Sequence, residues 1–165
     1  GIDYLVAACK LLANQYPELK DQMAVVTFGK QSTQLAEMLP FKVYPLDYVN
    51  NEHRLVDMYN AVDLFVTPSL EENLPNTIME AMACGTPCVG FNVGGIPEMI
   101  DHLHNGYVAC YKAVDDFANG IYWALTEPDY ASLSEQACRK AVSHYSEDSV
   151  AKRYIDLYNK LTERR

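Results

Sequence analysis

The sequence predicts an α/β fold, a Rossmann-like parallel sheet of about five strands with helices on both faces. Short apolar runs alternate with helical patterns along the whole chain. This alternation is typical of βαβ units with right-handed crossovers. The length of 165 residues suits a single domain with a substantial core. A hydrophobic content of 49% and a charged content of 21% are those of a globular protein.

The strands are expected where short apolar runs are bounded by turn residues. Gly29 stops the first run. Pro45 lies in the second run and suits an edge strand, because its nitrogen cannot donate to a ladder. The expected strands cover residues 23–28, 42–46, 63–67, 87–91 and 106–110.

The helices are expected between these strands and after the last one. The final helix is amphipathic, and Ser146 supplies its N-cap. We expect this helix to pack on the sheet of its own domain. The expected helices cover residues 3–16, 32–39, 52–59, 77–84, 98–100, 115–125, 130–144 and 148–161.

The most informative stretch is residues 69–87, where an apolar strand runs into a loop and then a helix. Pro75 opens that helix and Gly85 closes it, as these residues do most often. The helix is apolar almost all round, so we expect it to be buried, with Glu80 as its single charge. A carboxylate there is costly unless it meets a partner or faces a cleft. The preceding loop carries a second carboxylate, Glu72.

This order of residues suits a nucleotide-sugar ligand. A helix N-terminus offers free N–H groups and the positive end of a dipole, which favour phosphate. Carboxylates on either side of it suit hydroxyl groups on either side of a diphosphate. Ligands of parallel sheets bind beyond the carboxyl ends of the strands, and both Glu72 and Gly94 follow such ends.

Composition excludes several other classes of function. The net charge of −9 and a pI near 4.8 disfavour nucleic acid, and they disfavour membrane contact through this domain. The number of cysteines is odd and no C-x-x-C motif occurs, so we expect buried, reduced thiols in a cytosolic protein. The cysteines are Cys9, Cys84, Cys88, Cys110 and Cys138.

Two other residue types could suggest a site, but neither has the pattern that it needs. His102 and His104 have no third metal ligand at a typical spacing, so no metal site is expected. Ser69 lacks a nucleophile motif, and we expect it to satisfy the loop backbone.

Four ordered motifs resemble a known family. They are FVTPS at 65–69, Glu72-Asn73, EAMACGTP at 80–87 and GGIPE at 94–98. Together they resemble the C-terminal, donor-binding domain of retaining GT-B glycosyltransferases of the "glycosyl transferases group 1" or family-four type. The similarity extends to both ends, since residues 1–5 resemble the first helix of that domain and residues 105–108 its last strand.

The resemblance assigns roles to the site residues. It implies that Glu72 is the catalytic carboxylate and holds hydroxyls of the donor sugar, while Glu80 accepts hydrogen bonds from the ribose. It implies that the backbone N–H groups of Asn76 and Thr77 hold the diphosphate. The donor-binding set that it implies is Glu72, Asn73, Leu74, Asn76, Thr77, Glu80, Gly94 and Gly95.

The resemblance also implies the reaction and its partners. A sugar would pass from a nucleotide-diphosphate sugar to an acceptor hydroxyl with retention at the anomeric carbon, without a metal or another cofactor. The acceptor would be a polysaccharide, a glycolipid or a lipid-linked sugar, held by an N-terminal domain. The whole protein would be cytoplasmic, with any membrane contact peripheral and outside this domain.

The chain departs from the family pattern before its first helix, at Asp47, where a Gly is common, and at Leu74-Pro75, which replace a Gly-containing pair. The family's first strand, with an Arg and a Lys that grip the diphosphate, has no counterpart in residues 1–165, and neither has the acceptor domain. We therefore expect little or no transferase activity from these residues alone. Pro75 has no backbone N–H group, so one possible hydrogen-bond donor to the phosphate or the sugar is missing.

Two other interpretations stay open at this point. One is a sugar-nucleotide-binding module, or an inactive fragment, without catalysis. The other is a sugar-nucleotide epimerase of the same fold, which the glutamate motif fits less well. Gly94 and Gly95 form a turn that either serves positive φ alone or lies close to the donor sugar.

Overall fold

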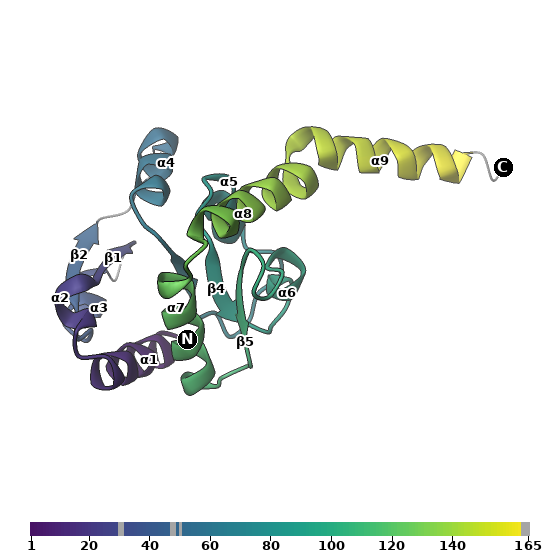
Figure 1. Ribbon diagram of the computed structural model, residues 1–165. Coiled ribbons are helices and arrows are strands. Elements are labelled where there is room, and N and C mark those ends of the chain that lie inside the picture. Colours follow the sequence, from purple (N-terminus) through teal and green to yellow (C-terminus); the bar gives the residue numbers. More distant parts are fainter. Residues whose placement is uncertain (30–31, 47–48, 50, 163–165) are drawn as a thin grey trace.

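The computed structural model describes residues 1–29, 32–46, 49 and 51–162, so Asp47 lies outside the described residues. Helices and strands alternate along the chain as the sequence predicts (Figure 1). In order they are α1 (Ile2–Gln15), α2 (Leu19–Gln22), β1 (Ala24–Phe28), α3 (Ser32–Ala36), β2 (Lys42–Leu46), α4 (Glu52–Asn60), β3 (Phe65–Thr67), α5 (Asn76–Ala83), β4 (Cys88–Phe91), α6 (Ile96–Met99), β5 (Gly106–Ala109), α7 (Val114–Thr126), α8 (Tyr130–Tyr145) and α9 (Glu147–Thr162). The short helix α2 is the element that the sequence analysis missed, because one turn is too short to show a period.

The strands are parallel, as expected, but they form two sheets instead of one. β1 pairs with β2, and β4 lies between β3 and β5. In the part of the chain that the structure describes, no strand pairs with both β1 and β3, so the two sheets are not joined by a ladder. Figure 1 shows β1 and β2 at one side of the molecule, apart from β4 and β5. Pro45 of β2 lies opposite Thr27 of β1. Among the described strands β2 pairs with β1 alone, so Pro45 is on an edge strand as expected.

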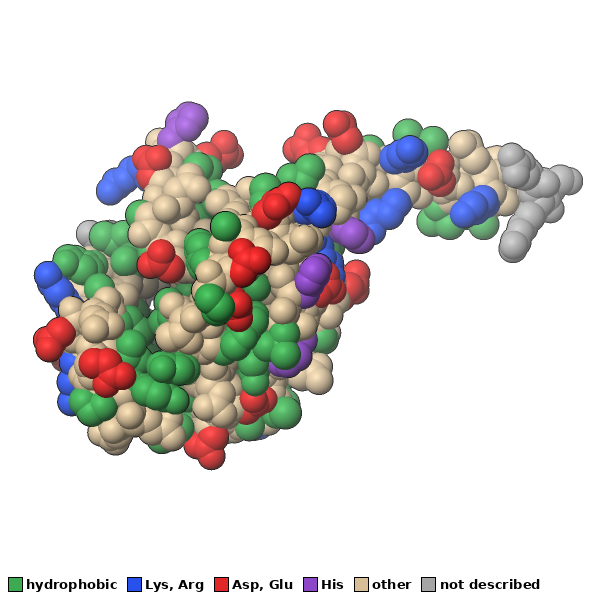
Figure 2. Space-filling model, viewed as in Figure 1, with side chains coloured by type: hydrophobic (Ala, Val, Ile, Leu, Met, Phe, Trp, Pro, Cys, Tyr) green, Lys and Arg blue, Asp and Glu red, His purple; other side chains and the backbone are tan. Residues whose placement is uncertain are grey.

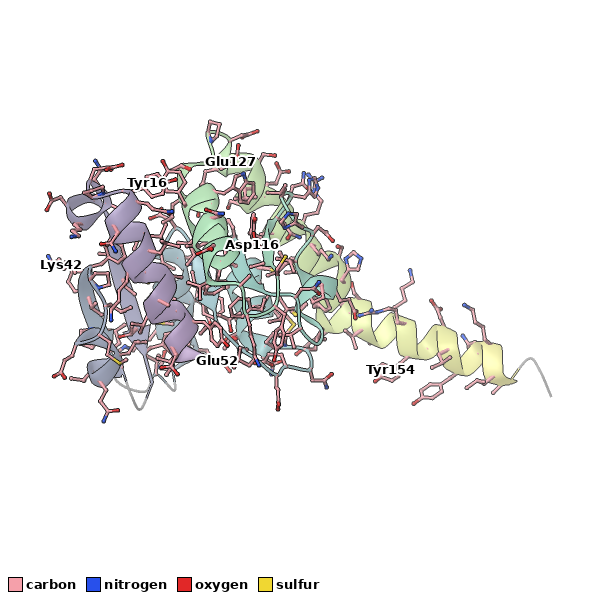
Figure 3. All side chains as sticks on the ribbon, turned by 90° about the horizontal axis from the view of Figure 1, so that it is seen from below. Tyr16, Lys42, Glu52, Asp116, Glu127 and Tyr154 are labelled. Carbon is pink, nitrogen blue, oxygen red and sulfur yellow. The ribbon has the colours of Figure 1, made fainter. Side chains whose placement is uncertain are left out.

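Helices cover both faces of the β3–β4–β5 sheet because its side chains alternate between the faces. Val89, Phe91 and Ala109 face a core shared with α1 and α7. Cys88 belongs to a second core, with Ile78 and other side chains of α5, α6 and α8. Figure 3 shows α1 and α7 side by side on one face. The sheet is therefore the middle of three layers, and its carboxyl edge is where the loops after β3 and β4 begin.

The last helix does not pack as the sequence analysis expects. Ser146 caps α9 as expected, since its Oγ accepts from the amide of Ser149 at 3.3 Å. However, no residue of α9 is buried, and the helix projects away from the body of the molecule (Figures 1 and 2). Its large apolar side chains from Tyr154 to Leu161, which include Leu157 and Tyr158, are at least half exposed. Amphipathicity showed which side of this helix is apolar, but it held no information about what covers that side.

The cysteines are free thiols, as expected, although not all are buried. Cys9 and Cys88 lie in the cores, whereas Cys110 is exposed just after β5. The expectation of burial is wrong for Cys110, which follows the end of β5, and it holds only in part for Cys84 and Cys138, which are half-buried. Among the described residues, no helix is both long enough and apolar enough to cross a membrane.

Candidate functional site

The loop that carries Glu72 is built against the glycine turn after β4. The amide of Gly95 donates to the carbonyl oxygen of Asn73 at 2.6 Å. A Cβ atom on Gly94 would lie 1.8 Å from the carbonyl oxygen of Glu72, and one on Gly95 would lie 2.2 Å from that of Asn73. Gly94 also has a φ of +54°. These glycines therefore serve close backbone approach as well as the turn, and they bring two distant loops into contact.

The side chain of Glu72 is held by the hydroxyl group of Ser69, which is itself bonded to that of Thr67. Ser69 Oγ donates to Glu72 Oε1 at 3.0 Å, and Thr67 Oγ1 lies 3.0 Å from Ser69 Oγ. Because Ser69 has one proton and gives it to the carboxylate, Thr67 is the donor to Ser69. The expectation that Ser69 satisfies the loop backbone is wrong, since its hydroxyl reaches a side chain three residues away. Glu72 itself is half-buried.

A hollow opens beside this loop. Its volume of about 450 Å³ falls within the range of small-ligand sites. It is lined by Asn73, Leu74, Gly94, Gly95 and Glu98. Four of these belong to the donor-binding set expected from the sequence. Glu98, which was not expected in the site, is the one carboxylate among these lining residues, since Glu72 and Glu80 are not among them.

The start of α5 is open, as a phosphate site requires. Pro75 is the N-cap residue, and no side chain caps the helix. Helical geometry leaves the first amides, those of Asn76 and Thr77, without an intrahelical acceptor. Asn76 is exposed and Thr77 half-buried, so the first turn is not covered. The expectation that this helix is buried all round is wrong. Asn76, Glu80 and Ala83 form an exposed stripe along it.

Glu80 lies on this exposed stripe, one turn after Asn76. Its Oε2 accepts a hydrogen bond from Tyr59 Oη at 3.0 Å. Burial and the charge of Glu80 raise the pKa of Tyr59. The ion pairs of the described residues, Arg139–Glu135 and Lys140–Asp101, leave Glu72 and Glu80 without a basic partner. Two carboxylates thus follow β3 at the open helix start, each bound to a hydroxyl group of the protein.

Tyr59 was not predicted as a site residue, because in the sequence it resembles an apolar-face residue of the helix at 52–59. No spacing in the chain connects it to Glu80, which lies 21 residues later. His102 and His104 are both exposed, and Nδ1 of His102 accepts from the amide of Val108 at 3.2 Å. Within the described ranges, no three His, Cys, Asp or Glu side chains come together to hold a metal ion.

A family model described as "Glycosyl transferases group 1" matches residues 1–127. The chain belongs to this family. It is 28% identical over 174 aligned positions to the D-inositol 3-phosphate glycosyltransferase of Thermobispora bispora, covering 98% of this chain and 40% of that protein. The resemblance of the four motifs to group 1 glycosyltransferases is therefore confirmed.

Solved structures show the same fold. Sucrose-phosphate synthase from Thermosynechococcus elongatus matches with a TM-score of 0.75 and 23% identity, over 100% of this chain and 43% of that one. Anabaena HepE, in complex with UDP and glucose, matches with a TM-score of 0.75 and 20% identity, over 93% of this chain and 44% of its own. These likenesses confirm the α/β fold as that of one half of a GT-B glycosyltransferase. The chain spans about two fifths of the length of the curated relatives it matches.

Proposed function

We propose that residues 1–165 form the donor-binding domain of a retaining glycosyltransferase. It would bind a nucleotide-diphosphate sugar, whose sugar passes to an acceptor hydroxyl on a polysaccharide, a glycolipid or a lipid-linked sugar. The observation that carries the proposal is the open start of α5, with Glu72 before it and Glu80 one turn into it. Each carboxylate uses one oxygen on an internal hydroxyl group, Ser69 or Tyr59. The second oxygen of each remains for a ligand hydroxyl.

The residues divide the ligand between them. The amides of Asn76 and Thr77 hold the diphosphate and stabilise the charge that it gathers as it leaves. Glu80 accepts from the ribose. Glu72 accepts from the sugar, which fills the hollow lined by Asn73, Leu74, Gly94 and Gly95. A carboxylate that binds a hydroxyl this way discriminates strongly against a ligand without it.

The comparisons support this choice of ligand. Two of the solved neighbours are complexes with UDP and a sugar, glucose in one and GlcNAc in the other. UDP-glucose is therefore the first donor to test, followed by GDP- and ADP-glucose. The acceptor would be bound by another domain. The free thiols of the described residues fit a reducing compartment such as the cytoplasm, with any membrane contact outside this domain.

We propose that donor binding needs no divalent cation. The described residues offer N–H groups to the diphosphate and no cluster of metal ligands. The affinity for UDP-glucose should stay the same when EDTA replaces magnesium chloride in a calorimetric titration. A loss of tenfold or more in EDTA would contradict this part of the proposal.

The roles of the two carboxylates are tested by calorimetry with UDP and UDP-glucose. Replacing a charged acceptor by an amide removes a hydrogen bond that is worth about 1.5–3 kcal/mol, or about 10- to 100-fold in affinity. Glu80→Gln should weaken both ligands by this factor, because both contain ribose. Glu72→Gln should weaken UDP-glucose alone, because UDP has no sugar to hold.

Glu71→Gln is the matched control. It makes the same chemical change on an exposed neighbour of Glu72, and it should leave both affinities unchanged. If the Glu72 and Glu80 variants have the same affinity as each other for UDP, and the same affinity as each other for UDP-glucose, the assigned roles are contradicted. No binding of any nucleotide or nucleotide sugar by the unmodified chain would overturn the donor site itself.

A further inference from the structure

The side chain of Tyr59 joins the protein core to the proposed ribose site. It lies in the last turn of α4 and is 2% exposed. Its hydroxyl is the one polar group of the side chain, and it donates to Glu80 Oε2 at 3.0 Å. A buried tyrosine needs a partner for its hydroxyl, but this partner is a carboxylate that faces solvent.

The position of Tyr59 is fixed from two other sides. Its ring packs edge-to-face on Phe65 of β3, with centroids 5.8 Å apart and planes at 76°. Its carbonyl oxygen accepts from Thr86 Oγ1 at 2.8 Å, and Thr86 is 2% exposed. Thr86 follows α5, the helix of Glu80. The hydroxyl of Tyr59 is thus a donor held at a set place relative to both the strand and the helix of the site.

Glu80 has no comparable restraint of its own. It is exposed on α5, and the ion pairs of the described residues do not include it. An exposed glutamate samples several rotamers, and ordering it when a ligand binds lowers affinity. A fixed donor on one oxygen removes part of that cost and keeps the other oxygen for the ligand.

We propose that Tyr59 is a positioning residue, whose hydroxyl orients the Glu80 carboxylate for the ribose hydroxyls of a nucleoside diphosphate. The inference rests on the proposed function, because it needs a ribose at Glu80. It adds a residue that neither the motifs nor the comparisons assign. A merely structural Tyr59 would affect stability and all ligands alike, whereas a positioning residue affects only ligands that have the ribose hydroxyls.

The test is calorimetry of the whole chain with UDP, GDP and ADP, each beside its 2′,3′-dideoxy counterpart, which has neither ribose hydroxyl. The unmodified chain should prefer the ribonucleotide. Tyr59→Phe keeps the ring and removes the hydroxyl, and it should reduce that preference by about fivefold, the effect of one hydrogen bond. Its affinity for the dideoxynucleotide should stay within twofold. In a Glu80→Gln background the substitution should have no further effect on the preference.

Tyr107→Phe is the matched control. Tyr107 Oη donates to a carboxylate as well, Asp116 Oδ1 at 2.7 Å, but on β5 and α7. This variant should keep the full preference for ribose. Thermal melting of both variants measures any structural effect separately.

The outcomes separate the two proposals. A chain that binds none of the six nucleotides overturns the donor site, and a chain that binds each pair equally overturns the ribose role of Glu80. A chain that prefers ribose and keeps this preference in Tyr59→Phe overturns the positioning role alone. If Tyr59→Phe does not fold, ring-labelled tyrosine in the unmodified chain decides by NMR. UDP should then shift the Tyr59 ring signal and 2′,3′-dideoxy-UDP should not, and a Tyr59 signal that neither nucleotide moves would overturn the role.

Discussion

The two carboxylates of the site are positioned by different means. Glu72 lies on a loop whose backbone is pressed against the glycine turn at Gly94, and its side chain is held by the neighbouring Ser69. Glu80 lies on a regular helix, and its side chain is held by Tyr59 from a distant helix. The loop side therefore depends on backbone shape, whereas the helix side depends on one side-chain contact. Substitutions at these places should have effects of different size and kind.

Gly94→Ala tests the loop side most severely. The new Cβ would lie 1.8 Å from the carbonyl oxygen of Glu72, and the φ of +54° disfavours alanine, so the loop has to move. We expect a loss of about 3 kcal/mol in the free energy of unfolding, and a loss of UDP-glucose binding, as for other strained positions. Urea denaturation and calorimetry measure the two effects.

Gly29→Ala is the control for this change. Gly29 has a φ of +105°, but none of the described residues lies within 4 Å of its Cβ position. It should therefore show the cost of backbone strain alone, about 1 kcal/mol, with binding kept. If both variants lose the same stability and keep the same affinity, close approach does not shape the loop side.

Alkaline pH should separate the two sides. The pKa of Tyr59 is raised above its ordinary value of 10.0, mainly by burial and then by Glu80. The folded state therefore favours the neutral phenol. The stabilisation of the folded state that comes from this raised pKa is complete below pH 10, and it is lost as the pH rises toward the raised pKa. The loss is at most about 1.4 kcal/mol for each pH unit above 10. Ser69 and Thr67, on the loop side, do not titrate.

Denaturation in urea at pH 8, 10 and 11 measures this difference. Between pH 10 and 11, Tyr59→Phe should lose less stability than the unmodified chain, and Ser69→Ala should lose the same amount as that chain. Buried thiols such as Cys9, whose pKa is raised to about 12 by burial, add the same loss to every variant. If the free energy of unfolding falls by the same amount in all three proteins, the ionisation of Tyr59 does not affect the helix side.

Ser69→Ala should have the smallest effect. It removes one hydrogen bond to a half-buried carboxylate and leaves the loop backbone in place. We expect about 1 kcal/mol, or about fivefold, in the affinity for UDP-glucose, with UDP unchanged. Ser143→Ala, which removes a bond to the carbonyl oxygen of Lys140 on α8, is the control and should change neither ligand. A loss for UDP as large as for UDP-glucose would argue against a role of the loop side in holding the sugar.

Much of this arrangement could be predicted from the sequence, because it depends on local signals. The alternation of short strands and helices, the opening of α5 at Pro75 and the turn at Gly94 all follow from neighbouring residues. The resemblance to group 1 glycosyltransferases rests on the same stretches, and the family is confirmed.

Features that depend on distant contacts could not be predicted. The division of the strands into two sheets depends on which strands pair, which an apolar run does not reveal. The bond from Tyr59 to Glu80 joins two helices, and the stripe of α9 has no contact that a periodicity could indicate. The roles of the two carboxylates toward a ligand stay predictions.

The most direct test is whether one ligand contacts both sides at once. Amide signals of a ¹⁵N-labelled chain can be followed by NMR during a titration with UDP-glucose. The signals of Asn76 and Thr77 should shift together with those of Glu72 and Glu80, along one binding curve with one Kd. Shifts confined to one side, or two curves with different midpoints, would contradict a single nucleotide-sugar site.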